Sequence, residues 1–152
     1  MIGPITIRQA IEAEQRALES LQLRASLNNE HDREHVLANP DSIHLPVEQI
    51  TAGRVFVAES DGAIVGFAVM LSRTGGGGEL DGLFVEPQSW RRGIGRTLVD
   101  YVGGIARSEG ATTLHVIGNP HAKDFYRTCG FVVEGNCQTR FGRGLTMRKT
   151  LA

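Results

Sequence analysis

The sequence predicts a mixed α/β domain, and three observations indicate this class. Short β-rich runs and stretches with helical periodicity alternate along the 152 residues. Asp61-Gly62 joins two apolar runs in the way that a tight β-hairpin requires. A glycine-bearing turn at residues 91–96 follows a strand and opens a helix with Ile94, Leu98 and Val102 at helical spacing. The length suits one domain, residues 1–152, with a substantial core.

The predicted elements alternate in a defined order. We expect strands at residues 5–8, 54–59, 63–71, 79–85, 113–117, 132–138 and 145–151. Helices are expected at about residues 10–26, 32–37 and 47–51, after the 91–96 turn, and after Pro120. The four glycines at 75–78 join two strands with no helix after them, so we interpret them as a flexible hairpin loop rather than a phosphate cradle.

The composition argues against several classes of binding partner. Sixteen Lys and Arg residues against seventeen Asp and Glu give a net charge of −1, so no global basic field indicates nucleic acid or an anionic membrane. No apolar run approaches the roughly 18 residues of a membrane span, and the N-terminal residues lack the apolar region of a signal peptide. Cys129 and Cys137 have neither metal-site nor disulfide spacing. We therefore expect a cytoplasmic protein without a metal.

The turn Arg91-Arg92-Gly93-Ile94-Gly95-Arg96 is the strongest functional signal. The first amides of a helix lack intrahelical partners, the helix dipole is positive there, and glycines let a phosphate approach the backbone. A dinucleotide-binding fold needs a third small residue where Leu98 stands, and a Walker loop needs Gly-Lys-Ser/Thr, which is absent. A phosphate-bearing ligand is the favoured interpretation, and an ordinary strand–turn–helix with solvated arginines is the alternative.

A second informative segment spans residues 112–131. Asn119 is placed to cap a helix that begins at Pro120, and Gly130 is placed to end it. Phe125, Tyr126 and Cys129 share one face of this helix. From spacing alone, Tyr126 is a core aromatic residue whose hydroxyl finds some partner.

His31 and His35 fall in a sequence pattern that is typical of a zinc site. His31-Asp32-Arg33-Glu34-His35 fits the H-x-x-E-H motif of an inverted zinc protease. The segment is polar on all sides and no third ligand has a matching context, so we interpret it as a solvated charged helix.

Together these segments resemble the GCN5-related N-acetyltransferase superfamily, which transfers an acyl group from acyl-coenzyme A to an amine. The resemblance rests on L-x-V-x-P at 83–87, x-x-G-x-G at 91–95 and N-x-x-A-x-x-F-Y-x-x-x-G-F at 119–131. One position departs from the family, since Trp90 stands where Gln or Arg is usual. Because the pyrophosphate contacts there are mostly backbone amides, we expect binding to survive without the usual side-chain contact at position 90.

The resemblance implies a fold, a cosubstrate and a set of contacts. The fold is an α/β (α+β) domain with a mostly antiparallel mixed sheet of about seven strands, splayed between the fourth and fifth, and about four flanking helices. The cosubstrate is acetyl-CoA, and residues 10–37 form the acceptor-side wall. The implied coenzyme contacts are Leu83, Phe84, Val85, Arg91, Arg92, Gly93, Ile94, Gly95, Arg96, Thr97, Asn119 and Phe125.

The reaction requires a base, because an alkyl ammonium has a pKa of about 10 and must lose a proton before it attacks. Glu79 and Asp81 alternate onto one face of their strand, and two buried carboxylates would raise each other's pKa. Glu79 matches the base of several family members by position, and Asp81 is the second choice. Both could instead be solvated carboxylates. His115 is a further alternative that we interpret as a packing residue.

The resemblance assigns the remaining roles. Tyr126 is the general acid near the departing sulfur, and Asn119 contacts the pantetheine arm. A backbone N–H near Leu83 could stabilise the oxyanion. We expect direct transfer in a ternary complex to an unidentified small-molecule or peptide amine, and a homodimer is left open. The alternatives are a non-catalytic acyl-CoA sensor and a protein N-acetyltransferase.

Overall fold

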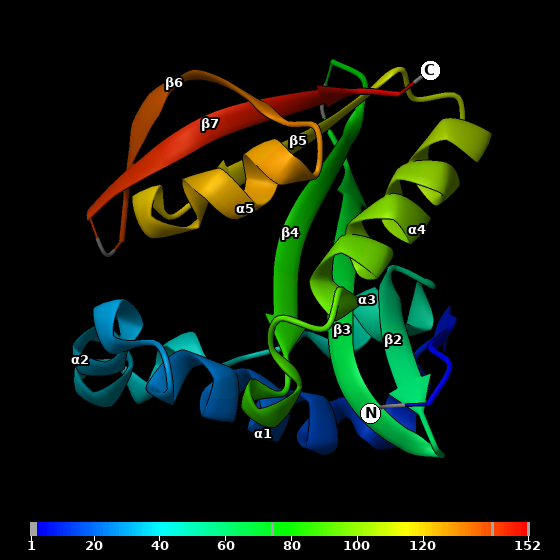
Figure 1. The fold of residues 1–152 in the computed structure, drawn as a ribbon, viewed down its shortest axis with the longest axis vertical. Coiled ribbons are helices and arrows are strands. Elements are labelled where there is room, and N and C mark those ends of the chain that lie inside the picture. Colours follow the sequence, from blue (N-terminus) through cyan, green and yellow to red (C-terminus); the bar gives the residue numbers. More distant parts are fainter. Residues whose placement is uncertain (1–2, 74, 141, 152) are drawn as a thin grey trace. The chain divides into compact units, whose positions relative to one another are not determined.

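The computed structural model describes residues 3–73, 75–140 and 142–151. The described strands form one sheet in the order β1-β2-β3-β4-β5-β7-β6 (Figure 1). The strands are β1 (Thr6–Gln9), β2 (Val55–Ser60), β3 (Ala63–Ser72), β4 (Gly78–Val85), β5 (Thr113–Gly118), β6 (Val132–Thr139) and β7 (Gly142–Thr150). The helices are α1 (Gln15–Leu27), α2 (Glu30–Ala38), α3 (Val47–Thr51), α4 (Ile94–Ser108) and α5 (Lys123–Thr128).

The predicted α/β class and the mixed, splayed sheet are confirmed. β1 with β2, β2 with β3, β5 with β7 and β6 with β7 pair antiparallel, whereas β4 with β5 pairs parallel. The parallel pairing comprises only Gly78 with Leu114 and Glu79 with His115, after which the two strands separate. Five α-helices are described, as the element order predicted, where the family resemblance implied about four; α3 is the expected short helix at 47–51.

The chain folds into two compact units. The first comprises Met1–Val69 and Gly82–Leu98, and the second comprises Met70–Asp81 and Val99–Ala152. β3, β4 and α4 each continue from one unit into the other.

The core of the first unit forms around β2, whose residues Val55–Ala58 are at most 2% exposed. Such a strand is buried on both faces and therefore needs no polar alternation. On β3, a Cβ added to Gly66 would lie 3.0 Å from the Phe84 carbonyl oxygen and within 3.3 Å of Leu98 and Ile94. Gly66 thus permits the start of α4 to pack directly against the sheet.

In the second unit, one face of β5 is buried and the other is not. Leu114 and Val116 are at most 4% exposed, whereas Ile117 is 53% exposed. A Cβ added to Gly78 of β4 would lie 3.1 Å from Ala106 of α4 and 3.4 Å from Leu114. The later part of α4 therefore covers the face that carries Leu114 and Val116.

Several element boundaries differ from the sequence-based expectation for local reasons. The expected helix at 10–26 begins as a 3₁₀ turn, Glu12–Glu14, and becomes α-helical at Gln15, because the Glu14 carboxylate turns back to accept from the Ile11 N–H and from Arg8. α2 begins at Glu30 rather than 32, since the Asn29 side chain caps the His31 N–H at 3.0 Å. β7 begins at Gly142 rather than 145, paired with Thr139.

The turns agree with their predicted chemistry. Asp61 and Gly62 have φ of 52° and 79°, the two positive values that a type I′ hairpin turn requires. Residues 75–77 join β3 and β4 and all three glycines have positive φ.

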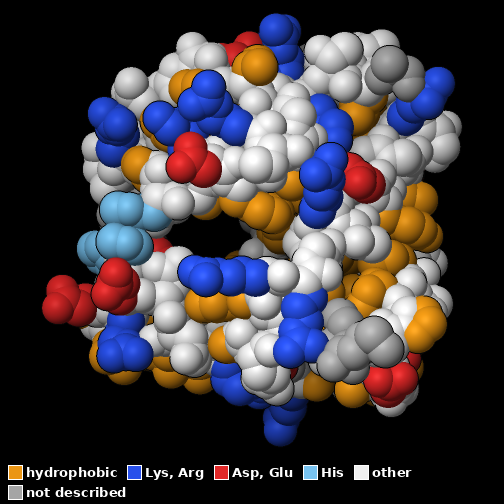
Figure 2. Space-filling view, viewed as in Figure 1, with side chains coloured by type: hydrophobic (Ala, Val, Ile, Leu, Met, Phe, Trp, Pro, Cys, Tyr) orange, Lys and Arg blue, Asp and Glu red, His pale blue; other side chains and the backbone are white. Residues whose placement is uncertain are grey.

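On the face shown in Figure 2, basic and acidic side chains are interspersed, in keeping with the near-neutral charge.

Candidate active site

The connection from β4 to α4 is a turn with two left-handed residues and an anchored helix start. Arg91 and Gly93 have φ of 65° and 80°. Ile94 is 1% exposed and fixes the first turn of α4 in the core. Thr97 donates to the Gly93 carbonyl from its backbone N–H at 3.0 Å and from its hydroxyl at 2.8 Å. The Gly93 carbonyl therefore faces into the helix, and the first N–H groups lack intrahelical acceptors.

Three arginines surround this helix start. The side chains of Arg91, Arg92 and Arg96 are exposed, and within the described part of the chain no ion pair neutralises them. Their charge adds to the positive end of the helix dipole. The predicted turn residues are thus together in one place, and their arrangement suits an anion such as a phosphate.

The second half of β4 has an open backbone edge. The Glu86 N–H donates to the Val65 carbonyl of β3 at 2.8 Å. By strand alternation, Leu83 and Val85 direct their N–H and C=O groups to the other side, where pairing with β5 has already ended. An extended ligand that contains amides can form β-type hydrogen bonds along such an edge.

Trp90 occupies part of this edge, a contact that the sequence does not predict. Its indole Nε1–H donates to the Val85 carbonyl at 2.7 Å, and the residue is 40% exposed. The N–H and C=O of Leu83 and the N–H of Val85 remain on the edge. The only signal in the sequence was that position 90 departs from the family pattern.

Glu79 and Asp81 lie two residues apart on β4, in the second unit. Glu79 is half-buried and Asp81 is exposed, and among the described residues neither carboxylate has an ion-pair or hydrogen-bond partner. Although Asp81 reaches solvent, neighbouring atoms remove part of its hydration, and this raises the pKa of its carboxyl above the usual range. The cause is desolvation and not the expected repulsion between the two carboxylates.

His115 is opposite Glu79 in the register but already has other partners. Its Nε2 lies 3.0 Å from the Thr113 hydroxyl, and its Nδ1 lies 3.8 Å from the Glu134 carboxylate. Burial, followed by the charge of Arg73, lowers the pKa of the imidazole. His115 is therefore a neutral, packed residue at physiological pH, as its mid-strand position suggested.

Asn119 and Tyr126 occupy the helical segment after β5. The Asn119 side chain accepts from the His121 N–H at 2.9 Å, with Pro120 in the first helical position, and Gly130 ends the helix with φ of 98°. The predicted caps are confirmed. The Tyr126 ring packs edge-on against Phe125 and Phe131, with centroids 5.2 and 5.5 Å apart.

The Tyr126 phenol is protonated at neutral pH, as the ordinary pKa of a phenol, about 10, already ensures. Burial, with a smaller contribution from Cys129, raises its pKa to about 12. Within the described residues, no group hydrogen-bonds to its hydroxyl. Its position depends on Gly118, since a Cβ there would lie 3.1 Å from the ring.

Glu79 and Tyr126 approach the sheet from opposite faces. Glu79 shares a face with its register partner His115, whereas Tyr126 packs on Gly118, three residues along β5. Residues an odd number apart on a strand point to opposite faces. The two predicted catalytic side chains therefore flank the sheet where the pairing of β4 and β5 ends.

Among the described residues, no three His, Cys, Asp or Glu side chains are placed to hold a metal ion together, and His31 and His35 of α2 are included in that statement. No helix in the described ranges is both long and apolar enough to cross a bilayer.

The comparisons with known proteins identify the family. The family model described as "Acetyltransferase (GNAT) family" matches residues 13–131. The chain belongs to this family. Members of this family are acetyltransferases, so this protein is an acyltransferase enzyme. A search of curated proteins finds no match to the sequence.

Solved structures with this fold include three that match nearly the whole acetyltransferase. A GCN5-related N-acetyltransferase from Rhodopseudomonas palustris is 20% identical, with 99% of this chain and 98% of that chain covered and a TM-score of 0.78. The PaiA N-acetyltransferase of Thermoplasma acidophilum, in complex with coenzyme A, is 20% identical (97% and 99% covered, TM-score 0.77). An aminoglycoside 6'-N-acetyltransferase complexed with coenzyme A is also 20% identical (97% and 97%, TM-score 0.75).

Trp90→Phe should reveal the contribution of the indole N–H to coenzyme binding. The substitution keeps an aromatic ring but frees the Val85 carbonyl, so the end of β4 loses one fixed contact. We expect affinity for coenzyme A to fall about two- to fivefold, in line with one hydrogen bond. Affinity for adenosine 3',5'-bisphosphate, which lacks the pantetheine arm, should not change. Calorimetry with both ligands tests this, and an equal loss for both would contradict it.

Proposed function

We propose that this acetyltransferase transfers the acetyl group of acetyl-CoA to the amine of a small molecule, by direct attack in a ternary complex. We further propose that residues 1–152 act as one catalytic domain. The observation that carries the proposal is the turn at 91–96, where a helix start, two left-handed residues and three arginines without ion pairs coincide. That combination suits the pyrophosphate of the coenzyme.

The remaining coenzyme contacts follow from the chemistry of its parts. Pantetheine is an extended chain with two amides, and the open backbone groups of Leu83 and Val85 offer a matching donor and acceptor pattern. We assign the Leu83 N–H to the thioester oxygen, where negative charge develops during attack. Phe84, Ile94, Gly95 and Thr97 complete the binding segment, and Asn119 and Phe125 are assigned to the arm near the sulfur.

In the proposed reaction, the acceptor nitrogen attacks the thioester carbonyl carbon. A C–N bond forms, the C–S bond then breaks, and the amine proton passes to Glu79 directly or through one water molecule. Glu79 is the preferred base because its carboxylate is half-buried and has no partner among the described residues. Asp81 is the second choice, and its raised pKa favours proton capture.

Tyr126 is proposed to act on the leaving sulfur as a donor. Its pKa of about 12 keeps the phenol protonated at neutral pH. A thiolate with a parent pKa of about 8.5 is a weaker base than this phenolate, so complete proton transfer from Tyr126 is uphill. The hydroxyl therefore stabilises the departing thiolate through a hydrogen bond, which is a restricted form of the general-acid role. The presence of both Glu79 and Tyr126 favours an enzyme over a non-catalytic acyl-CoA sensor.

Gly93→Val should weaken acetyl-CoA binding far more than Arg91→Ala. A Cβ at position 93 meets no atom within 4 Å, so the cost lies in the backbone, because valine avoids a φ of 80°. The turn should rearrange and misdirect its amides. We expect roughly a ten- to hundredfold loss of affinity for the glycine change, and about a threefold loss for the exposed arginine.

Gly104→Ala is the matched control for that experiment. Gly104 lies in α4, has an open space at its Cβ position and lacks a positive φ. Binding measured by calorimetry should be unchanged for this variant. A Gly93→Val loss no greater than that of Arg91→Ala would remove the support for the pyrophosphate assignment.

Glu79→Gln should lower turnover by roughly two to four orders of magnitude with coenzyme affinity nearly unchanged. Asp81→Asn is the matched comparison, two residues along the same face. If Asp81 is the base, its raised pKa moves the acidic limb of the pH–rate profile above the usual range of aspartate, and activity is lost as the pH falls through it. Full turnover in Glu79→Gln would transfer the role to Asp81 or to water.

Tyr126→Phe should reduce turnover by roughly ten- to a thousandfold while the melting temperature changes little. Only the hydroxyl is removed, and no described residue hydrogen-bonds to it, so the folded state loses no partner. Tyr101→Phe, on α4, is the control and should retain full turnover. A Tyr126→Phe protein that is less stable by about 1 kcal/mol but fully active would show that the residue only packs.

A further inference from the structure

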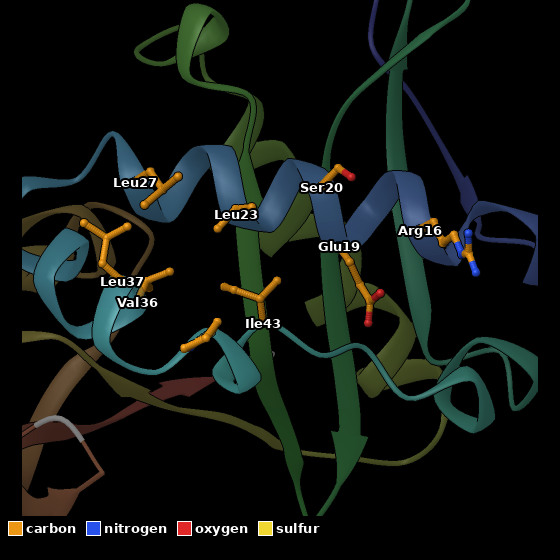
Figure 3. A pocket seen from close by; sticks show the side chains of 9 residues that line it. Arg16, Glu19, Ser20, Leu23, Leu27, Val36, Leu37 and Ile43 are labelled. Atoms are coloured by element: carbon orange, nitrogen blue, oxygen red, sulfur yellow. The ribbon is translucent and has the colours of Figure 1, made fainter.

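A pocket in the first unit is lined by α1, α2 and the segment that follows α2 (Figure 3). Its volume is about 600 Å³, within the range of small-molecule sites and larger than a packing defect. Leu23 and Leu27 of α1, Leu37 of α2 and Ile43 form its apolar wall. Leu23 is 38% exposed and Leu37 is 65% exposed, so the wall faces solvent in the free protein.

The polar end of the pocket has little capacity for a cation. Glu19 is the single carboxylate in the lining. One of its oxygens already accepts from the Leu45 N–H at 2.8 Å and lies 3.4 Å from His44. Arg16 lines the same end, and no ion pair neutralises it within the described residues. A molecule with several positive charges would therefore meet one engaged carboxylate and one cation.

An ion pair joins α1, which forms part of the pocket wall, to the end of the strand to which the coenzyme arm is assigned. Arg24, next to Leu23 on α1, forms a bidentate ion pair with Glu86, at 2.7 and 2.8 Å. Glu86 directly follows the last residue of β4 and is 7% exposed. This ion pair fixes α1, and with it the apolar wall, at the end of β4.

We propose that this pocket binds the apolar arm of the acceptor, and that the acceptor is a small primary amine with an alkyl or aryl group rather than a polycation such as an aminoglycoside. The inference rests on the proposed acetyl transfer and adds the substrate class. The concave shape favours a small molecule over a flat protein partner. Binding is also favoured because an apolar group would remove the exposed leucine side chains from water.

The test compares phenethylamine and hexylamine with spermidine and kanamycin as acceptors, with release of the coenzyme A thiol as the readout. We expect kcat/KM to be at least about tenfold higher for the two apolar amines. Leu23→Gln and Leu37→Gln keep helix propensity and remove apolar surface, and each should lower kcat/KM for phenethylamine about tenfold without changing KM for acetyl-CoA. Val132→Gln is the control, because Val132 is 56% exposed and does not line the pocket.

A reversed-charge variant provides a gain-of-function arm. Arg16→Glu places a second carboxylate at the polar end, and kcat/KM for spermidine should rise about threefold or more. Binding of phenethylamine, measured by ligand-observed NMR on the wild type and the two leucine variants, provides a readout that does not need turnover.

The outcomes separate the two proposals. Absence of coenzyme A binding would overturn the proposed function itself. If the coenzyme binds but spermidine or kanamycin is the better acceptor, the inferred substrate class is wrong. It is also wrong if only a peptide amine reacts, or if the leucine variants bind and acetylate phenethylamine as well as Val132→Gln does.

Discussion

The early end of the pairing between β4 and β5 is the constraint on which the candidate site depends. Only two residue pairs join these strands, and the backbone groups of Leu83 and Val85 are then left without a strand partner. Buried backbone donors and acceptors are costly when unpaired, so this edge has to be satisfied by water, a side chain or a ligand. Trp90 satisfies one carbonyl. The remaining groups are available to a ligand with amides.

The surroundings of Glu79 and Tyr126 suit the catalytic roles that we propose for them. Glu79 and Tyr126 flank opposite faces of the sheet. Glu79 has a carboxylate with no partner in the described structure, and Tyr126 has a phenol whose pKa is raised by burial. In the proposed reaction, the proton acceptor and the hydrogen-bond donor therefore lie on opposite faces of the sheet. Their separation prevents the two groups from neutralising each other.

The two sites that we propose for the coenzyme and the acceptor differ in charge. Arginines without ion pairs gather at the start of α4, where an anion is favoured, whereas the pocket between α1 and α2 has an apolar wall and an almost balanced polar end. The Arg24–Glu86 ion pair connects the two regions within the first unit, because it joins α1 to the end of the strand that leads into the turn. Its bidentate geometry and the burial of Glu86 make it a fixed contact and not a solvated surface pair.

Local chemistry in the sequence determined the turns, the caps and the order of the elements. Asp61-Gly62 favours a tight hairpin turn, Asn119-Pro120 favours a helix start, and Gly93 permits the left-handed turn before α4. These features depend on residues within a few positions of one another, so their effect is visible without the fold, and the family motifs at 83–95 and 119–131 are of the same kind.

Only the tertiary structure decided the features that join distant residues. The indole of Trp90 on the Val85 carbonyl, the desolvation of Asp81 and the pocket that brings Leu23 to Leu37 and Ile43 all arise from packing between separate elements. The Glu14 carboxylate that delays α1 also depends on Arg8 of β1. Hydration, burial and the direction of an unpaired backbone group are properties of the packed surroundings, and a periodic pattern along one strand or helix does not contain them.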